Sequence, residues 1–73
     1  SGGYLVGRDL PLGGYVFTAK NGQKGCVTLY KSYKDFKEEE MELTYEYFEE
    51  DYHLSLMEDG NYLLVENATI QKI

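Results

Sequence analysis

The sequence predicts an all-β fold, a small antiparallel β-sandwich or barrel-like roll of six to seven short strands. Three observations lead to this class. Apolar and polar residues alternate over short stretches, residues that favour turns separate those stretches, and aromatic residues, which suit strands, make up 15% of the chain. A chain of 73 residues has room for one hydrophobic core. We therefore expect a single β module over residues 4–73, with residues 1–3 as a linker or cloning remnant.

The opening residues predict a strand and a tight turn. Residues 4–7 are mostly apolar and predict the first strand. In the turn that follows, Asp9 can cap the backbone, Pro11 fixes its own φ, and Gly13 supplies a positive φ. The chain is expected to reverse direction there.

The next two strands are expected over residues 15–20 and 25–31. The first of them carries apolar side chains on both faces, which indicates a central position in its sheet. Asn21 and Gly22 predict a type I′ hairpin turn between the two strands, because both residues tolerate positive φ. Gly25 predicts a bulge or a close approach of backbone to another group.

Residues 32–40 predict a loop, with one helical turn inside it as an alternative. Ser32 followed by Asp35 resembles a helix capping box, but too few apolar residues follow for a helix with a buried face.

Two further strands are expected over residues 42–47 and 51–57, joined as a hairpin. In the first of them Leu43, Tyr45 and Tyr47 lie on one face and polar residues on the other, which predicts an antiparallel strand with one solvated face.

The last two strands are expected over residues 62–66 and 69–71. Asp59 and Gly60 predict a tight hairpin turn before them. Burial of alternate side chains then predicts the core, namely Val6, Tyr15, Phe17, Val27, Leu29, Leu43, Tyr45, Leu54, Leu56, Leu64 and Ile70.

The charge and the lone cysteine argue against several classes of function. The formal net charge of −6 disfavours nucleic-acid binding, which relies on Lys and Arg. No apolar run approaches the length of a membrane span, so we expect membrane attachment only through an anchor outside this fragment. Cys26 has no partner for an internal disulfide and is expected to be a buried thiol. The single His53, at an outward position, adds no catalytic or metal-binding pattern.

The opening of the chain resembles that of small β-rich modules in secreted proteins and lipoproteins of Gram-positive bacteria. Their general form is Tyr-x-Val-Gly-x-Asp-(Ile/Leu)-Pro-x-Gly-x-Tyr, which residues 4–15 match at every fixed position. Residues 59–68 resemble the segment that closes those modules. The charged residues 31–40 depart from the family, so a shared ligand site in that loop is not carried over. The resemblance implies an extracytoplasmic module of uncharacterised function, and it brings no catalytic residues.

Acidic residues crowd the middle of the chain and could offer oxygen ligands to Ca²⁺. Such a cluster would contain Glu38, Glu42, Glu46, Glu49, Glu50 and Asp51. Their spacing matches no calcium-binding loop, and runs of charge are usually solvated surfaces. We therefore expect no metal or cofactor, with a Ca²⁺-binding module as an alternative.

Aromatic residues in the same segment indicate a binding surface made of Tyr33, Phe36, Tyr47 and Phe48. We expect a non-enzymatic accessory, adhesion-type or spacer module of a bacterial envelope or secreted protein. Its partners would be a protein or a carbohydrate, together with other domains of a longer parent chain. An intracellular interaction or regulatory domain is a further alternative.

Overall fold

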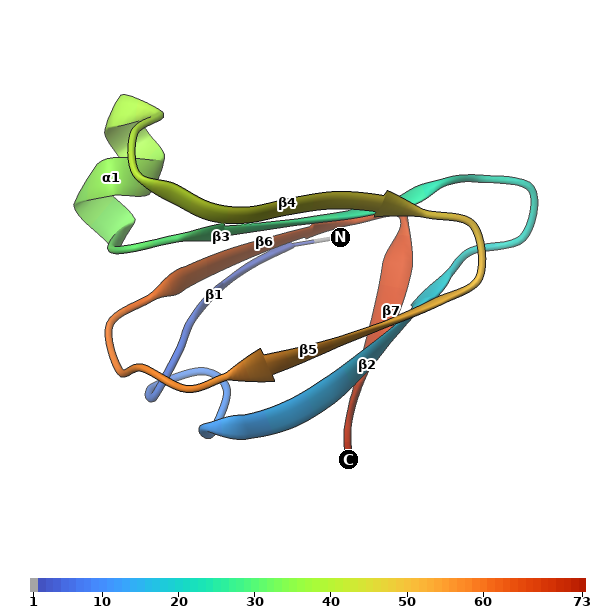
Figure 1. The fold of residues 1–73 in the computed structure, drawn as a ribbon, viewed down its shortest axis with the longest axis horizontal. Helices are drawn as coiled ribbons and strands as arrows, with labels where there is room; N and C mark the ends of the chain where they lie inside the picture. Colours follow the sequence, from blue (N-terminus) through green and yellow to red (C-terminus); the bar gives the residue numbers. More distant parts are fainter. Residues whose placement is uncertain (1) are drawn as a thin grey trace.

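The computed structural model of the chain describes residues 2–73, which form a two-layer β-sandwich (Figure 1). One layer is a four-stranded sheet in the order β1-β6-β3-β4, and the other is a three-stranded sheet in the order β5-β2-β7. Every strand pairing in these two sheets is antiparallel. The predicted all-β class is confirmed. The elements are β1 Gly2–Leu5, β2 Gly13–Ala19, β3 Gly25–Tyr30, α1 Tyr33–Glu38, β4 Glu42–Phe48, β5 Asp51–Leu56, β6 Tyr62–Glu66 and β7 Ala68–Lys72.

Most connections cross from one sheet to the other. In the described chain only the connection from β3 to β4, which contains α1, stays within one sheet. The three expected hairpins, at residues 20–24, 49–50 and 57–61, are therefore wrong, since each of these segments carries the chain between layers (Figure 1). A turn signal reports a reversal of direction, but it does not decide which sheet the next strand joins.

The turn at Asn21 and Gly22 also differs in type from the prediction. The Gln23 N–H donates to the Lys20 carbonyl oxygen at 3.0 Å, and Gly22 has a φ of 74°. Asn21 does not adopt a positive φ. A positive φ at the second central residue alone matches a type II turn, whereas the expected type I′ turn needs it at both.

The first strand begins earlier than expected, at Gly2 instead of residue 4. Gly2 and Gly3 pair with Val65 and Leu64 of β6, so the module includes both glycines. The strand ends at Leu5, whose carbonyl oxygen accepts hydrogen bonds from the N–H groups of Arg8 and Asp9. The backbone has already turned at the expected strand residue Gly7, whose φ is 97°.

The hydrophobic core lies between the two sheets. As predicted, Val6, Tyr15, Phe17, Val27, Leu29 and Leu56 are buried there, and β2 is the central strand of its sheet. Leu54 and Ile70 are partly buried against this core. The prediction chose Leu64 of β6, but Leu63 and Val65 are the core residues, because the alternation of β6 starts one position away from the one assumed.

Strand β4 turns the opposite face to the core from the one predicted. Leu43 and Tyr45 are 51% and 53% exposed, whereas Phe48 is 9% exposed. Thr44 and Glu46 pair with the core residues Leu29 and Val27, so these two positions of β4 point inward, as Phe48 does. Phe48 fixes this choice, because its ring packs into the core, stacked on Tyr52 at 5.6 Å and against Gly25.

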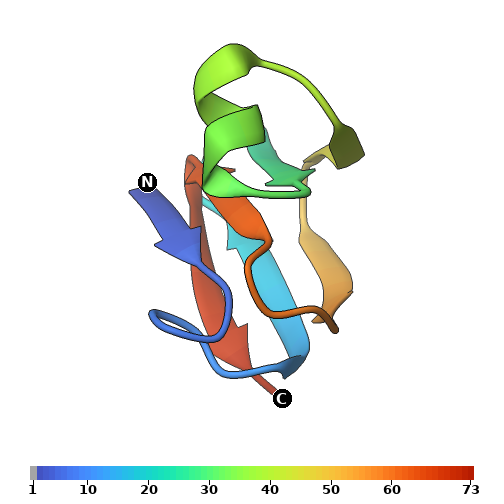
Figure 2. The same ribbon diagram turned by 90° about the vertical axis from the view of Figure 1, so that its left-hand side faces the viewer.

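Helix α1 sits on the outer side of the four-stranded sheet at one end (Figure 2). The Ser32 hydroxyl accepts the Asp35 N–H at 3.1 Å, which is the N-cap contact of a capping box, and it donates to the Asp35 carboxylate at 2.7 Å. Glu39, with a φ of 57°, ends the helix. A helix of six residues is too short to cross a bilayer, and residues 2–73 contain no other helix.

Candidate aromatic binding surface

The four-stranded sheet carries aromatic side chains on its outer face. Strand register places Tyr47 beside Cys26, Tyr45 beside Thr28, and Tyr30 beside Tyr62, all pointing away from the sandwich core. Tyr33 and Phe36 of α1 lie above the same face. We call this set the outer aromatic face. It consists of Tyr30, Tyr33, Phe36, Tyr45, Tyr47 and Tyr62.

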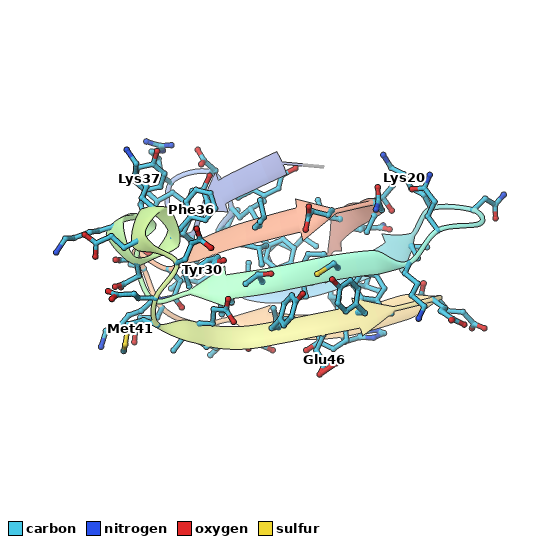
Figure 3. All side chains as sticks on the ribbon, turned by 90° about the horizontal axis from the view of Figure 1, so that it is seen from above. Lys20, Tyr30, Phe36, Lys37, Met41 and Glu46 are labelled. Atoms are coloured by element: carbon cyan, nitrogen blue, oxygen red, sulfur yellow. The ribbon has the colours of Figure 1, made fainter. Side chains whose placement is uncertain are left out.

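One half of the outer aromatic face is packed by α1. The Phe36 ring lies 4.5 Å from the Tyr62 ring and 5.4 Å from the Tyr30 ring, measured between centroids. Tyr33 meets Tyr62 edge-on at 5.1 Å. Figure 3 shows Phe36 reaching from the helix toward Tyr30. This half attaches the helix to the sheet. Each such ring pair contributes about 0.5–1.5 kcal/mol of stability beyond that of the apolar area it buries.

The other half is open to solvent. Tyr45 and Tyr47 are 53% and 60% exposed, although they are neighbours on one face of β4. Their rings meet edge-on at 5.4 Å, and the Tyr45 hydroxyl donates to the Tyr47 hydroxyl at 2.9 Å. This hydrogen bond, followed by desolvation, raises the pKa of Tyr45 to about 12. The two rings thus hold each other in one arrangement without being buried.

The exposed position of Tyr45 and Tyr47 is not required for core packing. Among the residues that the structure describes, the three-stranded sheet covers the same core without aromatic residues on its outer face. The outward positions of the three-stranded sheet hold no aromatic residue in the described chain. They are occupied by Gly14, Val16, Thr18, Asp51, His53, Ser55, Thr69 and Gln71. Within residues 2–73, the exposed aromatic residues of the strands therefore lie on the four-stranded sheet.

The structure brings together only part of the predicted binding surface. Tyr47 is exposed on β4, and Tyr33 is 49% exposed on α1. Phe36 is half-buried between Tyr30 and Tyr62. Phe48 is a core residue, so its assignment to the surface is wrong. Sequence reasoning missed Tyr45, which alternation alone had assigned to the core.

A bulge gives β4 its exposed leucine. Thr44 pairs with Leu29 and Glu42 pairs with Tyr30, so Leu43 is the extra residue between them. On the inward side of the same strand, Glu46 lies opposite Val27. A carboxylate at an inward position of an edge strand discourages another strand from pairing there. Contact through the face of β4 is therefore favoured over addition of a strand at its edge.

The acidic residues do not gather as one site. Among residues 2–73, one group of three or more acids has carboxylate oxygens that all lie within 4.8 Å of one another, namely Asp35, Glu38 and Glu40. Of the six acids considered for Ca²⁺, only Glu38 belongs to this group. Glu42 and Glu46 lie on β4, whereas Glu49, Glu50 and Asp51 follow that strand. An extended chain advances about 3.3 Å per residue, so these acids are spread along the chain.

Cys26 and His53 lie on opposite faces of the molecule. Cys26 is buried on the outer side of the four-stranded sheet, and burial raises the pKa of its thiol while a hydrogen bond with Thr28 lowers it. His53 is exposed on the outward side of the three-stranded sheet, opposite Val16. A catalytic thiol needs a base within hydrogen-bonding reach, and His53 is not placed to serve.

Of the predicted turn residues, Asp9 and Pro11 lie between β1 and β2, Gly13 begins β2, and Asp59 and Gly60 lie between β5 and β6, whereas Asn21 and Gly22 lie between β2 and β3. The Asp9 carboxylate accepts the Leu5 N–H at 2.8 Å, and the Pro11 carbonyl oxygen accepts the Tyr15 hydroxyl at 2.6 Å. Gly13 has a φ of 140°. Gly60, which follows the exposed Asp59, has a φ of 92° and donates its N–H to the Val6 carbonyl oxygen.

Arg8 forms an ion pair with Asp9 in the first of these loops. The Arg8 Nε and Nη2 atoms donate to the two Asp9 carboxylate oxygens at 3.1 and 3.2 Å. The hydrogen bond from Arg8, followed by the one from the Leu5 N–H, lowers the pKa of the Asp9 carboxyl.

Comparison of the chain with protein-family models, curated proteins and solved structures gave no match.

Proposed function

We propose that this chain is a non-enzymatic binding module of a bacterial envelope or secreted protein, and that Tyr45 and Tyr47 form the centre of its binding surface. The observation that carries the proposal is the exposure of two adjacent tyrosine rings on one strand, held together by their own hydroxyl groups. Tyrosine is enriched at protein interfaces, where it supplies a large contact area.

The geometry of the pair lowers the entropic cost of binding. A tyrosine side chain has few rotatable bonds, and the Tyr45–Tyr47 hydrogen bond restricts them further before any partner arrives. A partner of ordinary interface size would cover about 800 Å² of this module. That area exceeds two tyrosine rings and would extend to the exposed neighbours Leu43 and Met41.

The charge around the pair favours a basic partner. Residues 38–51, which include β4, contain eight acids and no Lys or Arg. Such a field attracts cationic segments and repels anionic ones. Lys and Arg side chains also bind the faces of aromatic rings. A protein segment rich in Lys or Arg therefore fits this surface better than a neutral or acidic one.

The placement in an envelope or secreted protein rests on the resemblance of residues 4–15 and 59–68 to modules of that kind. A spacer without a ligand is the competing function. It is favoured by the small size of the module, and it predicts that Tyr45 and Tyr47 can be replaced without any loss of binding.

A peptide-display screen on the purified module tests the proposal. We expect enrichment of peptides that contain Lys or Arg, with affinity that falls as salt rises. The double variant Tyr45→Thr/Tyr47→Thr keeps residues that suit a strand and should weaken binding at least tenfold. The matched control His53→Thr changes an exposed strand residue on the opposite sheet and should bind as the wild type does.

Circular dichroism and urea unfolding would first establish that the variants fold. Failure of every peptide to distinguish the wild type from the double variant would favour the spacer. Enrichment of acidic peptides would contradict the electrostatic part of the proposal.

A further inference from the structure

A second surface feature lies on the same side of the four-stranded sheet, beside α1. It is a pocket of about 420 Å³ lined by Gly3, Leu5, Arg8, Asp9, Tyr33 and Tyr62. These residues come from β1, the loop that follows it, α1 and β6. Gly3 lies in the same cross-strand row as Leu64, Thr28 and Tyr45, three strand spacings or about 14 Å from Tyr45. The pocket is therefore separate from the Tyr45–Tyr47 pair.

The aromatic wall of the pocket is held in place. Tyr62 packs against Phe36 at 4.5 Å and meets Tyr33 edge-on at 5.1 Å. The hydroxyl end of Tyr62 lies over Gly3, where a Cβ atom would overlap it. A glycine at this position is thus required for the observed orientation of the Tyr62 ring. The wall is formed before any ligand arrives.

The polar end of the pocket is also fixed. Asp9 is held by the Leu5 N–H at 2.8 Å, and Arg8 is held by both carboxylate oxygens of Asp9. An arginine side chain has five N–H donors, of which the bonds to Asp9 use two. The Arg8 side chain is 73% exposed, so its other donors face solvent. The pocket presents a hydrogen-bonding pair next to two tyrosine rings.

We propose that this pocket binds a neutral sugar ring. A pyranose has one face of C–H groups and a rim of hydroxyl groups, which matches an aromatic wall beside a donor and an acceptor. The remaining N–H groups of Arg8 donate to ring hydroxyls, and the Asp9 carboxylate accepts from them. A volume of about 420 Å³ lies in the ordinary range for small-ligand sites.

The charges around the pocket favour a neutral ligand. Arg8 and Asp9 neutralise each other, so a charged ligand would find no unpaired opposite charge in the pocket. Lys37 lies 5.8 Å from the centre of the Tyr33 ring, but it does not line the pocket. An anion would also meet the net charge of −6, and a cation would meet Arg8.

Nuclear magnetic resonance titration of the isotope-labelled module with neutral sugars tests the proposal. The probes are glucose, galactose, mannose, N-acetylglucosamine and their uncharged short oligomers, with inorganic phosphate as the anionic comparison. We expect saturable shifts at the amides of residues 3–9, 33 and 62 for at least one sugar, with a Kd on the order of 1 mM for a single ring.

Two variants assign those shifts to the pocket. Arg8→Gln, at an exposed position, should raise the Kd about tenfold, the effect of losing one charge-assisted hydrogen bond. Lys20→Gln makes the same change of charge at the opposite end of the molecule from α1 and should leave the Kd unchanged (Figure 3). Tyr33→Ala should also weaken binding, because it removes one aromatic wall.

Absence of shifts with every sugar would overturn the proposal, and so would a Kd that Arg8→Gln does not change. Saturable shifts of the pocket amides with phosphate alone would mean that the pocket binds an anion and not a sugar, and would overturn the proposal. Sugar-dependent shifts centred on residues 45 and 47 would also overturn it. Because the residues differ, loss of peptide binding in the Tyr45→Thr/Tyr47→Thr variant would leave this result unchanged.

Discussion

The Tyr15 hydroxyl donates a hydrogen bond of 2.6 Å to the carbonyl oxygen of Pro11, four residues earlier. Tyr15 belongs to the central strand of the three-stranded sheet, and its side chain is buried in the core. The bond therefore ties the first long loop to the core.

Replacing Tyr15 with Phe should lower the free energy of unfolding by about 1 kcal/mol, since it removes one hydrogen bond and keeps the ring. Urea unfolding measures the change. Tyr52→Phe is the matched control, because the Tyr52 hydroxyl has no hydrogen-bond partner among residues 2–73. Equal losses in both variants would contradict a specific role for the bond to Pro11.

Asn61 should be sensitive to truncation because it joins several loops. The side chain is buried and donates from Nδ2 to the Lys31 carbonyl oxygen at 3.0 Å, while the backbone carbonyl oxygen of Asn61 accepts the Val6 N–H. Asn61→Ala should cost about 1–3 kcal/mol in urea unfolding, because the Lys31 oxygen loses its partner and the buried Asn61 side chain is removed. Asn21→Ala, in an exposed turn, should change stability by no more than about 0.5 kcal/mol.

Phe48 and Tyr47 should respond very differently to the same substitution, although they are adjacent. Phe48→Ala is expected to cost about 3–5 kcal/mol, because it opens a cavity beside Tyr52. Tyr47→Ala should cost about 1 kcal/mol or less, because the ring is already 60% exposed. If the alanine variant of Phe48 does not fold, Phe48→Leu compared with Tyr47→Leu gives the same ranking in urea unfolding. The opposite ranking would mean that β4 presents its other face to the core.

Alkaline titration should reveal the bond between Tyr45 and Tyr47. The pKa of Tyr45, about 12, lies above the unfolded value of about 10. The folded state therefore holds this proton longer, so the stabilising contribution is complete below about pH 10 and is lost as the pH rises through about 12. Tyr47→Phe removes the acceptor, and Tyr45 should then ionise at lower pH. Ultraviolet absorbance of tyrosinate measures the shift, with Tyr4→Phe as the control; an unchanged profile for the remaining tyrosines in Tyr47→Phe would contradict the bond.

The positions of the strands could be read from the sequence because each strand lies between residues that favour turns. Gly22 and Gly60 have the positive φ that their turns require. The pairing of strands could not be read in the same way. A turn such as Asn21-Gly22 permits either a hairpin or a passage to the other sheet, and the choice depends on contacts between distant residues such as Gly2 and Val65.

The orientation of β4 was predicted wrongly for a related reason. Alternation divides the strand into two sets, and Leu43, Tyr45 and Tyr47 are the more apolar one. The core takes the other set because it contains Phe48, which fits beside Gly25 and Tyr52. In this orientation Tyr45 lies on the surface, where it forms the candidate site together with Tyr47. Sequence reasoning could find the site only by asking why so many aromatics lie in an acidic segment.

The crossing connections also determine when the chain can acquire its structure. Strand β1 pairs only with β6, and β7 pairs only with β2, so each layer needs residues from both ends of the sequence. A polypeptide emerging from the ribosome would have to release residues 62–72 before either sheet is complete. Topologies dominated by such distant pairings fold in milliseconds to seconds, whereas helical bundles fold in microseconds to milliseconds. Until then Phe17 and its neighbours stay uncovered, and a chain cut before residue 62 lacks one strand of each sheet.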